Sequence, residues 1–347
     1  MSPWPADILV CPRDATCLRS DRGDRLVCIQ GHEYPVVDGV PVMLVDEAVQ
    51  TIGVAHDSLR QARAAGAGAN TDPWYVDSLG LSEDERRSVV QLAAAGGSRI
   101  DPAVVYLVAA TNGLAYQHLI GKLQDYPIPT LRLPRGAGRT LIDIGCSWGR
   151  WSVAAARLGY RAIGIDPSLG AVMAARRVAR ALGADVRHVV GDARSLPFAT
   201  GSVDVVFSYS VIQHFSRADA ADAIAEAGRV LRPGGMSLIQ MPTRWGVRCL
   251  YHQARRRFRE AAGFEVRYWT LGALRRLFTD RIGPTEASVD CFFGIGLQPT
   301  DRHLMPFAYR LVISASEALR AASRFVPPLS YVADSVYLSS VKALPTL

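Results

Sequence analysis

The sequence predicts an α/β fold, in which a mainly parallel sheet is flanked by helices and preceded by a small β-rich module and a helical cap. From about residue 139 onwards, short apolar runs alternate with segments of helical length, as in strands joined by helical crossovers. Residues 1–48 instead alternate short β-like runs with turn residues, and residues 49–135 have mostly helical patterns. We therefore expect three regions, at 1–48, 49–135 and 136–347.

Composition restricts the class of protein. With 347 residues and 49% hydrophobic residues, the chain can bury the core of one large domain and one small one. No apolar run reaches the roughly 18 to 20 residues that span a bilayer, and the N-terminus lacks the pattern of a secretory signal. We therefore expect no membrane span and a cytoplasmic location. Six cysteines are too few for a disulfide framework, so metal binding or packing is their expected role.

The positive charge is unevenly distributed. The formal net charge is +7, and apart from Lys122 and Lys342 every basic side chain that carries it is an arginine. Genomic base composition is the simplest cause of this preference. Residues 244–281 nevertheless hold ten arginines against three acids, so an anionic partner would bind there.

The helices and strands of the last two regions follow from local signals. Ser82 with Glu85 three residues later predicts a capping box, and Asp101 followed by Pro102 predicts an N-cap and a first helical turn. Residues 125–139 form an extended, proline-rich linker. Five strands are expected at 140–146, 160–166, 185–192, 202–211 and 235–242, with helices at 168–183 and 217–232 among the connections.

Polar and glycine residues stand where these strands end. Gly145 and Gly149 follow the first strand and allow a ligand to approach the backbone closely. Asp166 ends the second strand, where its carboxylate can accept two hydrogen bonds from a ribose diol. Asp192 ends the third and could meet an adenine amino group. Because parallel strands bind ligands at their carboxyl ends, these residues predict a nucleotide-like site.

Four ordered motifs identify the family that this region resembles. They are "LIDIGCSWGRW", "AIGIDPS", "VVGDARSLPFATGSVDVVFSYSVIQHF" and "RVLRPGGMSLIQMP", and they cover about residues 139–242. In this order and spacing they resemble a class I S-adenosylmethionine-dependent methyltransferase; a nicotinamide dehydrogenase is the weaker alternative. The resemblance implies a Rossmann-like sheet of seven strands, the last antiparallel and supplied by "SVYLSSVKA" at 335–343.

The same resemblance implies which residues bind S-adenosylmethionine. Asp166 would hold the ribose hydroxyls. Ser147 stands where the usual pattern has glycine, which is tolerable because a sulfonium cofactor has no pyrophosphate to hold. The complete set of expected cofactor residues is Asp143, Gly145, Cys146, Gly149, Asp166, Asp192, Ala193, Ser208 and Tyr209.

His214 is the candidate catalytic residue. It follows the fourth strand, where it could act as a general base or contact the acceptor, although a locally bonded helix-start histidine is the alternative. Gln213 could contact cofactor or acceptor. Asn112 and Tyr116 could cover the mouth of the pocket, but helix packing explains both more simply.

The acceptor is less well defined by the sequence. The fourth strand lacks the proline-aromatic motif typical of enzymes that methylate base amino groups. The arginines and aromatic residues of 244–269 could bind RNA, bind a phosphorylated or lipid-linked glycan, or simply cover the sheet. We expect O-methylation of a small molecule such as a glycan, lipid-linked or specialised metabolite; an RNA base methyltransferase and a non-catalytic cofactor-binding scaffold are the alternatives.

The N-terminal module resembles the zinc-ribbon-like domain of the small methyltransferase-activator proteins, chiefly through "YPVVDGVPVML". The resemblance implies a zinc site with four tetrahedral ligands. Cys11, Asp14, Cys28 and His32 are the candidates, with aspartate where cysteine is expected, and Cys17 could replace Asp14. A metal-free β module is the alternative. In either case we expect the module to contact the catalytic domain or a partner.

Overall fold

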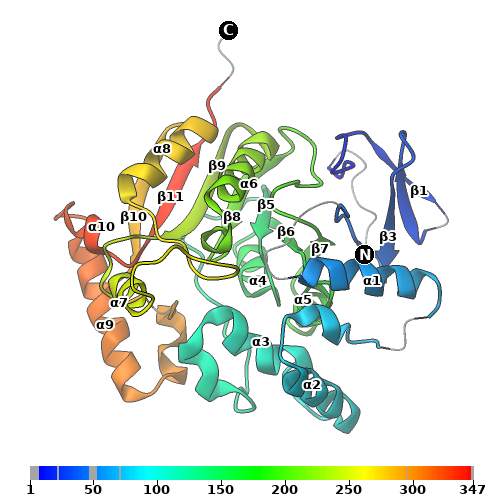
Figure 1. The fold of residues 1–347 in the computed structure, drawn as a ribbon, viewed down its shortest axis with the longest axis horizontal. Coiled ribbons are helices and arrows are strands. Elements are labelled where there is room, and N and C mark those ends of the chain that lie inside the picture. The colour runs from blue at the N-terminus through cyan, green and yellow to red at the C-terminus, as the bar shows by residue number, and fades with distance from the viewer. Residues whose placement is uncertain (1–7, 22, 47–52, 70–71, 295, 345–347) are drawn as a thin grey trace.

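The computed structural model describes residues 8–21, 23–46, 53–69, 72–294 and 296–344. Its main sheet has seven strands in the order β10-β11-β9-β8-β5-β6-β7 (Figure 1). The strands are β5 (Thr140–Ile144), β6 (Arg161–Asp166), β7 (Val186–Val190), β8 (Val203–Ser208), β9 (Leu231–Pro242), β10 (Thr285–Cys291) and β11 (Ser335–Val341). The five strands from β9 to β7 in this order run parallel, whereas β11 is antiparallel to both neighbours. The predicted α/β fold and antiparallel last strand are confirmed.

Helices cover both faces of this sheet, because successive strand residues point to opposite sides. Leu141 and Phe207 pack with the first group of helices, and Ile142 and Val206 pack with the second. The first group includes α3 (Pro102–Asn112), α4 (Arg150–Arg157) and α5 (Leu169–Ala181); the second includes α6 (Arg217–Val230) and α8 (Leu271–Arg281). The strands are therefore buried on both sides, as parallel strands require.

The region before the sheet is helical, as expected. It contains α1 (Val54–Gly66), η1 (Val76–Leu79), α2 (Glu83–Ala95), α3 and η2 (Leu114–Leu119). The capping box of Ser82 and Glu85 forms, and Asp101 caps α3. Ser58 of α1 accepts the Leu169 N–H at 2.8 Å. The cap thereby satisfies a backbone donor at the start of α5, beside the carboxyl ends of the strands.

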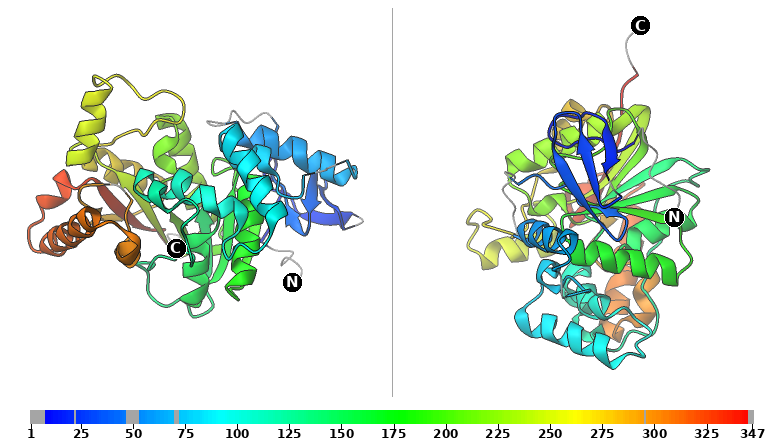
Figure 2. Two further views of the ribbon diagram at one scale, coloured as in Figure 1. Left: turned by 90° about the horizontal axis from the view of Figure 1, so that it is seen from below. Right: turned by 90° about the vertical axis from the view of Figure 1, so that its right-hand side faces the viewer.

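The N-terminal module packs against the β7 edge of the main sheet (Figure 2). It is an antiparallel sheet of β1 (Leu18–Asp21), β2 (Arg25–Cys28), β3 (Glu33–Val37) and β4 (Val40–Pro41). Val42 forms a parallel bridge with Val190, and the Met43 N–H donates to the Val190 carbonyl at 2.7 Å. The module therefore covers an edge that would otherwise expose unpaired backbone groups.

The opposite edge carries the C-terminal helices (Figure 1). They are α7 (Val247–Arg255), α9 (Phe307–Ala322) and α10 (Leu329–Val332), with η4 (Pro299–Leu304) before α9, whereas η3 (Ile212–His214) lies between β8 and α6. Asp334 fixes the start of α7, because its Oδ1 accepts the N–H groups of Arg248 and Cys249 at 2.7 and 3.0 Å. Among the described residues, no helix is both long enough and apolar enough to cross a membrane.

Candidate functional site

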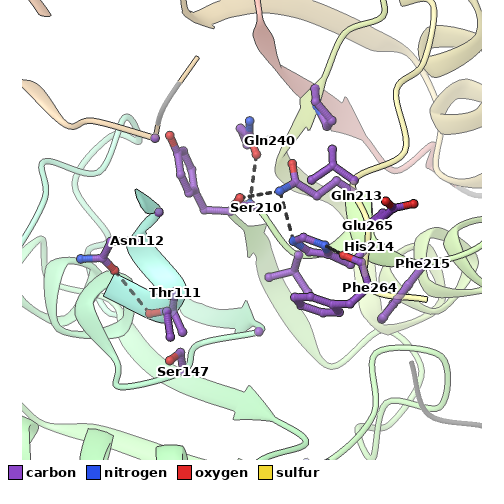
Figure 3. Close-up of a pocket in the computed structure, with 18 of the residues that line it drawn as sticks. Thr111, Asn112, Ser147, Ser210, Gln213, His214, Phe215, Gln240, Phe264 and Glu265 are labelled. Carbon is purple, nitrogen blue, oxygen red and sulfur yellow. Dashed lines mark hydrogen bonds between the residues drawn. The ribbon is translucent and has the colours of Figure 1, made fainter. Parts of the chain in front are cut away.

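A cavity of about 1060 Å³ opens at the carboxyl ends of the parallel strands. The turn after β5 and the ends of β6 and β7 line one part of it, while the segment after β8 and helix α7 line the other. Figure 3 shows Thr111, Asn112 and Ser147 on one side and Ser210, Gln213 and His214 on the other. The predicted location of the site is therefore where the structure has its large cavity.

The glycine turn after β5 is shaped by a close backbone contact. Gly145 has φ +72°, and a Cβ added there would lie 2.2 Å from Cγ2 of Val211. Ser147 also has a positive φ, of 46°, and its N–H donates to Asp166 Oδ2 at 2.9 Å. Its Oγ is buried and has no hydrogen-bond partner within the described part of the chain. The turn thus carries a buried hydroxyl without a protein partner, which a glycine would lack.

Asp166 lies opposite this turn with its carboxylate fixed by backbone donors. Oδ2 accepts the Ser147 N–H and Oδ1 accepts the Ser168 N–H, both at 2.9 Å. Each oxygen retains a second lone pair. Burial raises the pKa of Asp166 to about 6. The carboxyl group is therefore ionised at neutral pH and becomes protonated in mild acid.

The expected cofactor residues do not all reach the cavity. Its lining contains Gly145, Cys146, Asp166, Asp192, Ala193 and Tyr209. Asp143, Gly149 and Ser208 are absent from the lining. Asp143 accepts a hydrogen bond from Ser152 at 2.6 Å, Gly149 caps α4, and Ser208 Oγ donates to the Ile144 carbonyl. These three residues hold together the strands and helix behind the turn.

Asp192 is placed as expected but is already engaged. It forms an ion pair with Arg194, with Oδ2 and Nη2 2.6 Å apart. The Arg194 N–H also donates to Asp192 Oδ1 at 2.9 Å. A ligand amino group would therefore have to share this carboxylate rather than find it free.

His214 faces the other part of the cavity, and its partner comes from a distant segment. Its Nδ1 is 2.7 Å from the Phe264 carbonyl, and the Phe264 ring stacks on the imidazole with centroids 3.9 Å apart. Because a carbonyl can only accept, Nδ1 carries the proton and Nε2 has the lone pair in the neutral ring. Burial is the main cause that lowers the pKa of His214, and Arg267 adds to it, against the opposing bond to Phe264. The partner of His214 Nδ1 therefore comes from a segment 50 residues away rather than from its own turn.

A short hydrogen-bonded chain leads to this histidine (Figure 3). Gln240 Oε1 accepts the Ser210 N–H at 3.0 Å, and Ser210 Oγ accepts from Gln213 Nε2 at 2.7 Å. The same Gln213 nitrogen lies 3.3 Å from His214 Nε2. The sequence suggested Gln213 but neither Ser210 nor Gln240. The contact between Ser210 and Gln240 joins two separate strand ends, so it does not follow from local sequence.

Helix α7 and the segment after it supply an arginine-rich wall to the cavity. We define the α7 wall as Arg248, His252, Arg255, Arg256 and Arg257, all of which line the cavity. Trp245 and Tyr251 are each 48% exposed. Some rings of this region are therefore exposed, whereas Trp269 is buried.

The four expected metal ligands lie together in the N-terminal module. Cys11, Asp14, Cys28 and His32 each offer one ligand atom, all within 4.8 Å of one another. His32 Nδ1 is 3.4 Å from both sulfurs and 3.1 Å from Asp14 Oδ2. A tetrahedron with metal bonds of 2.0 to 2.3 Å has edges of about 3.3 to 3.8 Å, so these spacings suit a zinc ion. Cys17 is exposed and outside the group.

Tyr116 belongs to the supporting structure rather than to the cavity lining. It is fully buried, and its hydroxyl donates to Asp301. Asp301 also accepts from Arg150 Nη2 at 2.8 Å. This buried trio joins the cap, α4 and η4, which confirms the packing interpretation of Tyr116. Asn112 does line the cavity, and its Nδ2 is buried without a partner among the described residues.

Comparison with known proteins agrees with this geometry. Residues 141–235 match the family model of a methyltransferase domain. A probable S-adenosylmethionine-dependent methyltransferase of Mycolicibacterium smegmatis is 39% identical over 110 residues, which are 32% of this chain and 40% of that protein. A ubiquinone biosynthesis O-methyltransferase of Azorhizobium caulinodans is 32% identical over 102 residues, covering 29% of this chain and 40% of that protein. The chain thus spans about two fifths of these relatives.

Among solved structures, a complex between the Haloferax volcanii Trm112 methyltransferase activator and a methyltransferase is similar with a TM-score of 0.43. It is 18% identical, and the match covers 71% of this chain and 95% of that chain.

Proposed function

We propose that this chain is a cytoplasmic enzyme that methylates an oxygen of a small molecule. The premise is the match of residues 141–235 to the model of a methyltransferase domain. The observation that carries the proposal is a single cavity that joins Asp166 to His214. One end offers a carboxylate and free polar groups suited to S-adenosylmethionine. The other offers a neutral imidazole suited to an acceptor hydroxyl.

The residues at the first end fit the cofactor. Asp166 would accept hydrogen bonds from the ribose hydroxyls with the lone pairs that its backbone donors leave free. Ser147 Oγ and Asn112 Nδ2 are buried polar atoms without protein partners, and polar ligand atoms would satisfy them. Gly145 leaves room for close approach to the backbone. When bound, S-adenosylmethionine supplies a methyl group on a sulfonium, which is already activated for transfer.

At the second end, His214 would act as the general base. The Phe264 carbonyl holds the proton on Nδ1, so Nε2 is the basic atom. The contact of Nε2 with Gln213 is long, at 3.3 Å, and an acceptor hydroxyl could replace it. The lowered pKa keeps the ring neutral at physiological pH, in the state that can accept a proton.

The relatives support an oxygen acceptor. The Azorhizobium caulinodans protein is an O-methyltransferase by name, and it is 32% identical to this chain over 102 residues. Removing a proton matters most when the acceptor is a hydroxyl, because transfer to oxygen leaves that proton to be lost. A fixed basic nitrogen in the cavity is consistent with this class of acceptor.

The first experiment separates cofactor binding from transfer. Calorimetry with S-adenosylhomocysteine would measure binding, and transfer would be assayed with an acceptor found by screening hydroxylated small molecules. We expect His214→Ala to lower kcat by about 10² to 10⁴, which is the usual contribution of a general base. Its affinity for S-adenosylhomocysteine should stay within about twofold of that of the parent protein. Asp166→Ala should instead lose binding.

Other results would decide against parts of the proposal. Unchanged turnover in His214→Ala would remove the base assignment. Tight binding of the cofactor without transfer to any acceptor would favour the scaffold. If the parent protein binds neither S-adenosylmethionine nor S-adenosylhomocysteine, the proposed function is wrong.

For the N-terminal module we propose a structural zinc ion held by Cys11, Asp14, Cys28 and His32. The four donors are a chemically suitable set, and hydrogen bonds from Thr16 hold the pKa of Asp14 below its usual range, so that it is ionised. The module lies far along the chain from His214 and contacts the β7 edge, so the ion would stabilise this docking rather than take part in transfer.

Native mass spectrometry tests the zinc proposal. We expect one zinc ion per chain, lost in Cys28→Ser together with a fall in melting temperature, because metal binding is linked to folding of such modules. Cys17→Ser is the matched control, since Cys17 is a nearby exposed thiol outside the group, and it should keep the metal. Equal metal content in both variants, or none in the parent protein after zinc addition, would contradict the site.

A further inference from the structure

We propose that the α7 wall binds a phosphate group of the acceptor. This inference rests on the proposed function, because it names the chemistry of the acceptor that the same cavity takes. The wall residues Arg248, His252, Arg255, Arg256 and Arg257 line the cavity beyond His214, and four of the five carry a permanent positive charge.

The positive charge of this wall is only partly balanced, because Glu265 beside it also lines the cavity and acts on Arg256 but is paired with another arginine. Arg259, the next arginine along, pairs with Glu265 at 2.6 Å. Within the described part of the chain, no acidic side chain forms an ion pair with any of the four wall arginines. Asp334 also lines the cavity, and it accepts backbone N–H groups of Arg248, Cys249 and Gly294. An anionic ligand would supply the missing charge.

Two of these arginines also have buried donors without partners. The Nε atoms of Arg248 and Arg256 are buried and lack a hydrogen-bond partner among the described residues. A buried donor left unpaired costs more than an average hydrogen bond contributes, so an acceptor that pairs with either donor would remove this cost. Arg256 is also held in place, because Nη1 donates to the Val266 carbonyl at 2.9 Å and the guanidinium lies over the Tyr268 ring.

The positive charge of the wall arginines also shifts the pKa of His252, the histidine of the wall. The pKa of His252 is lowered by burial first, and then by Arg248 and Arg255. Arg256 lowers it further, while Asp334 opposes the shift. Three neighbouring cations therefore outweigh the one carboxylate that acts on this imidazole.

The wall stands close enough to His214 to hold the same small molecule. Arg256 bonds the carbonyl of Val266, and His214 bonds the carbonyl of Phe264, two residues earlier. Two residues of chain span at most about 7 Å. An acceptor can therefore place its anionic group on Arg256 and its hydroxyl at His214 without being longer than an ordinary metabolite.

Phosphate fits this wall better than a single carboxylate does. Arginine forks match the oxygens of phosphate, and several uncompensated cations suit a group that carries up to two negative charges. The arginines line the cavity that also contains the cofactor end, which favours a discrete acceptor over an extended RNA strand. The phosphate could belong to a soluble metabolite or to a lipid, and the experiment distinguishes them.

The test uses inorganic pyrophosphate as the probe and the full chain saturated with S-adenosylhomocysteine. Calorimetry would compare the parent protein with Arg248→Gln, Arg256→Gln and Arg276→Gln. Arg276 is an exposed arginine of α8 outside the cavity, so it controls for the loss of one charge. We expect each wall variant to weaken pyrophosphate binding about tenfold or more, and the control to remain within about twofold.

Vesicles containing phosphatidic acid provide the second arm. Competition between these vesicles and pyrophosphate that depends on Arg248 and Arg256 would assign the phosphate to a lipid; binding of pyrophosphate without such competition would assign it to a soluble molecule. Either result supports the phosphate site.

Three results would overturn the inference. They are no pyrophosphate binding by the parent protein, equal weakening in the wall variants and Arg276→Gln, and arginine-dependent binding of single-stranded RNA without pyrophosphate binding. Retained affinity for S-adenosylhomocysteine in these cases would leave the proposed function intact. Loss of that affinity in the parent protein would contradict the proposed function itself, independently of the anion.

Discussion

At the scale of single residues, the charge state of Asp166 should control cofactor affinity. Its pKa of about 6 comes from burial, and the backbone N–H groups of Ser147 and Ser168 only partly offset that effect. Above pH 6 the carboxylate can accept two ribose hydrogen bonds. Below pH 6 it becomes protonated and loses part of this capacity.

We therefore predict that affinity for S-adenosylhomocysteine falls as the pH is lowered from 7 to 5. Below about pH 6 the dissociation constant should rise by about tenfold per pH unit, since one proton must be released on binding. Calorimetry across this range measures the effect. Asp166→Asn should bind weakly with little pH dependence, and a steep dependence in that variant would show that another group is responsible.

The residue scale also shows where sequence interpretation reaches its limit. Asp166 and Gly145 could be predicted because a strand end and a turn fix their environment locally. Asp143 and Ser208 were expected in the lining, yet they point to Ser152 and to the Ile144 carbonyl. Neighbouring residues at a strand end face different ways, and the motif alone does not say which side meets the ligand.

At the scale of elements, the glycine turn after β5 depends on one packing contact. Gly145 combines a positive φ with a Cβ position 2.2 Å from Val211. Gly183 has a similar φ of +61° but nothing within 4 Å of the added Cβ. The two positions therefore separate backbone strain from steric exclusion.

We predict that Gly145→Ala lowers the free energy of unfolding by more than Gly183→Ala does. Gly183→Ala should cost about 1 to 2 kcal/mol, the price of a left-handed backbone with a side chain. Gly145→Ala adds displacement of Val211 and should also weaken S-adenosylhomocysteine binding. Adding Val211→Ala should recover part of the loss. Denaturant unfolding measures all three, and equal costs for the two single variants would contradict the role of Val211.

The order of elements could be predicted because it depends on local periodicity, whereas the position of the segment after α7 could not. The alternation of strands and helices from β5 to β9 follows from apolar spacing and from caps such as Ser168. The contact of Phe264 with His214 joins residues 50 positions apart, and no local pattern in the segment around Phe264 predicts it. The acceptor end of the cavity is built largely from such contacts.

At the scale of the whole molecule, a buried ion pair joins parts that are distant in the chain. Asp301 of η4 accepts from Arg150 of α4 and from Tyr116 of the cap, and the exposed fractions of the Asp301 and Arg150 side chains are 1% and 7%. Arg150 also lies within 6 Å of the Trp148 and Trp151 ring centroids. One buried guanidinium on α4 thus joins the cap to the C-terminal segment, in addition to the contacts that the cap makes with α5.

We predict that Asp301→Asn lowers the free energy of unfolding by about 3 kcal/mol, because it leaves Arg150 charged and buried without a compensating carboxylate. The surface pair of Glu83 and Arg87 is the control, and Glu83→Gln should cost at most about 0.5 kcal/mol. Adding Arg150→Met to Asp301→Asn should restore stability, since the uncompensated charge is then gone. Denaturant unfolding of the parent protein, the two single variants and the double variant measures these free energies. If Asp301→Asn lowers the free energy of unfolding no more than Glu83→Gln does, water or another group must neutralise Arg150. The buried trio would then not hold the cap in place.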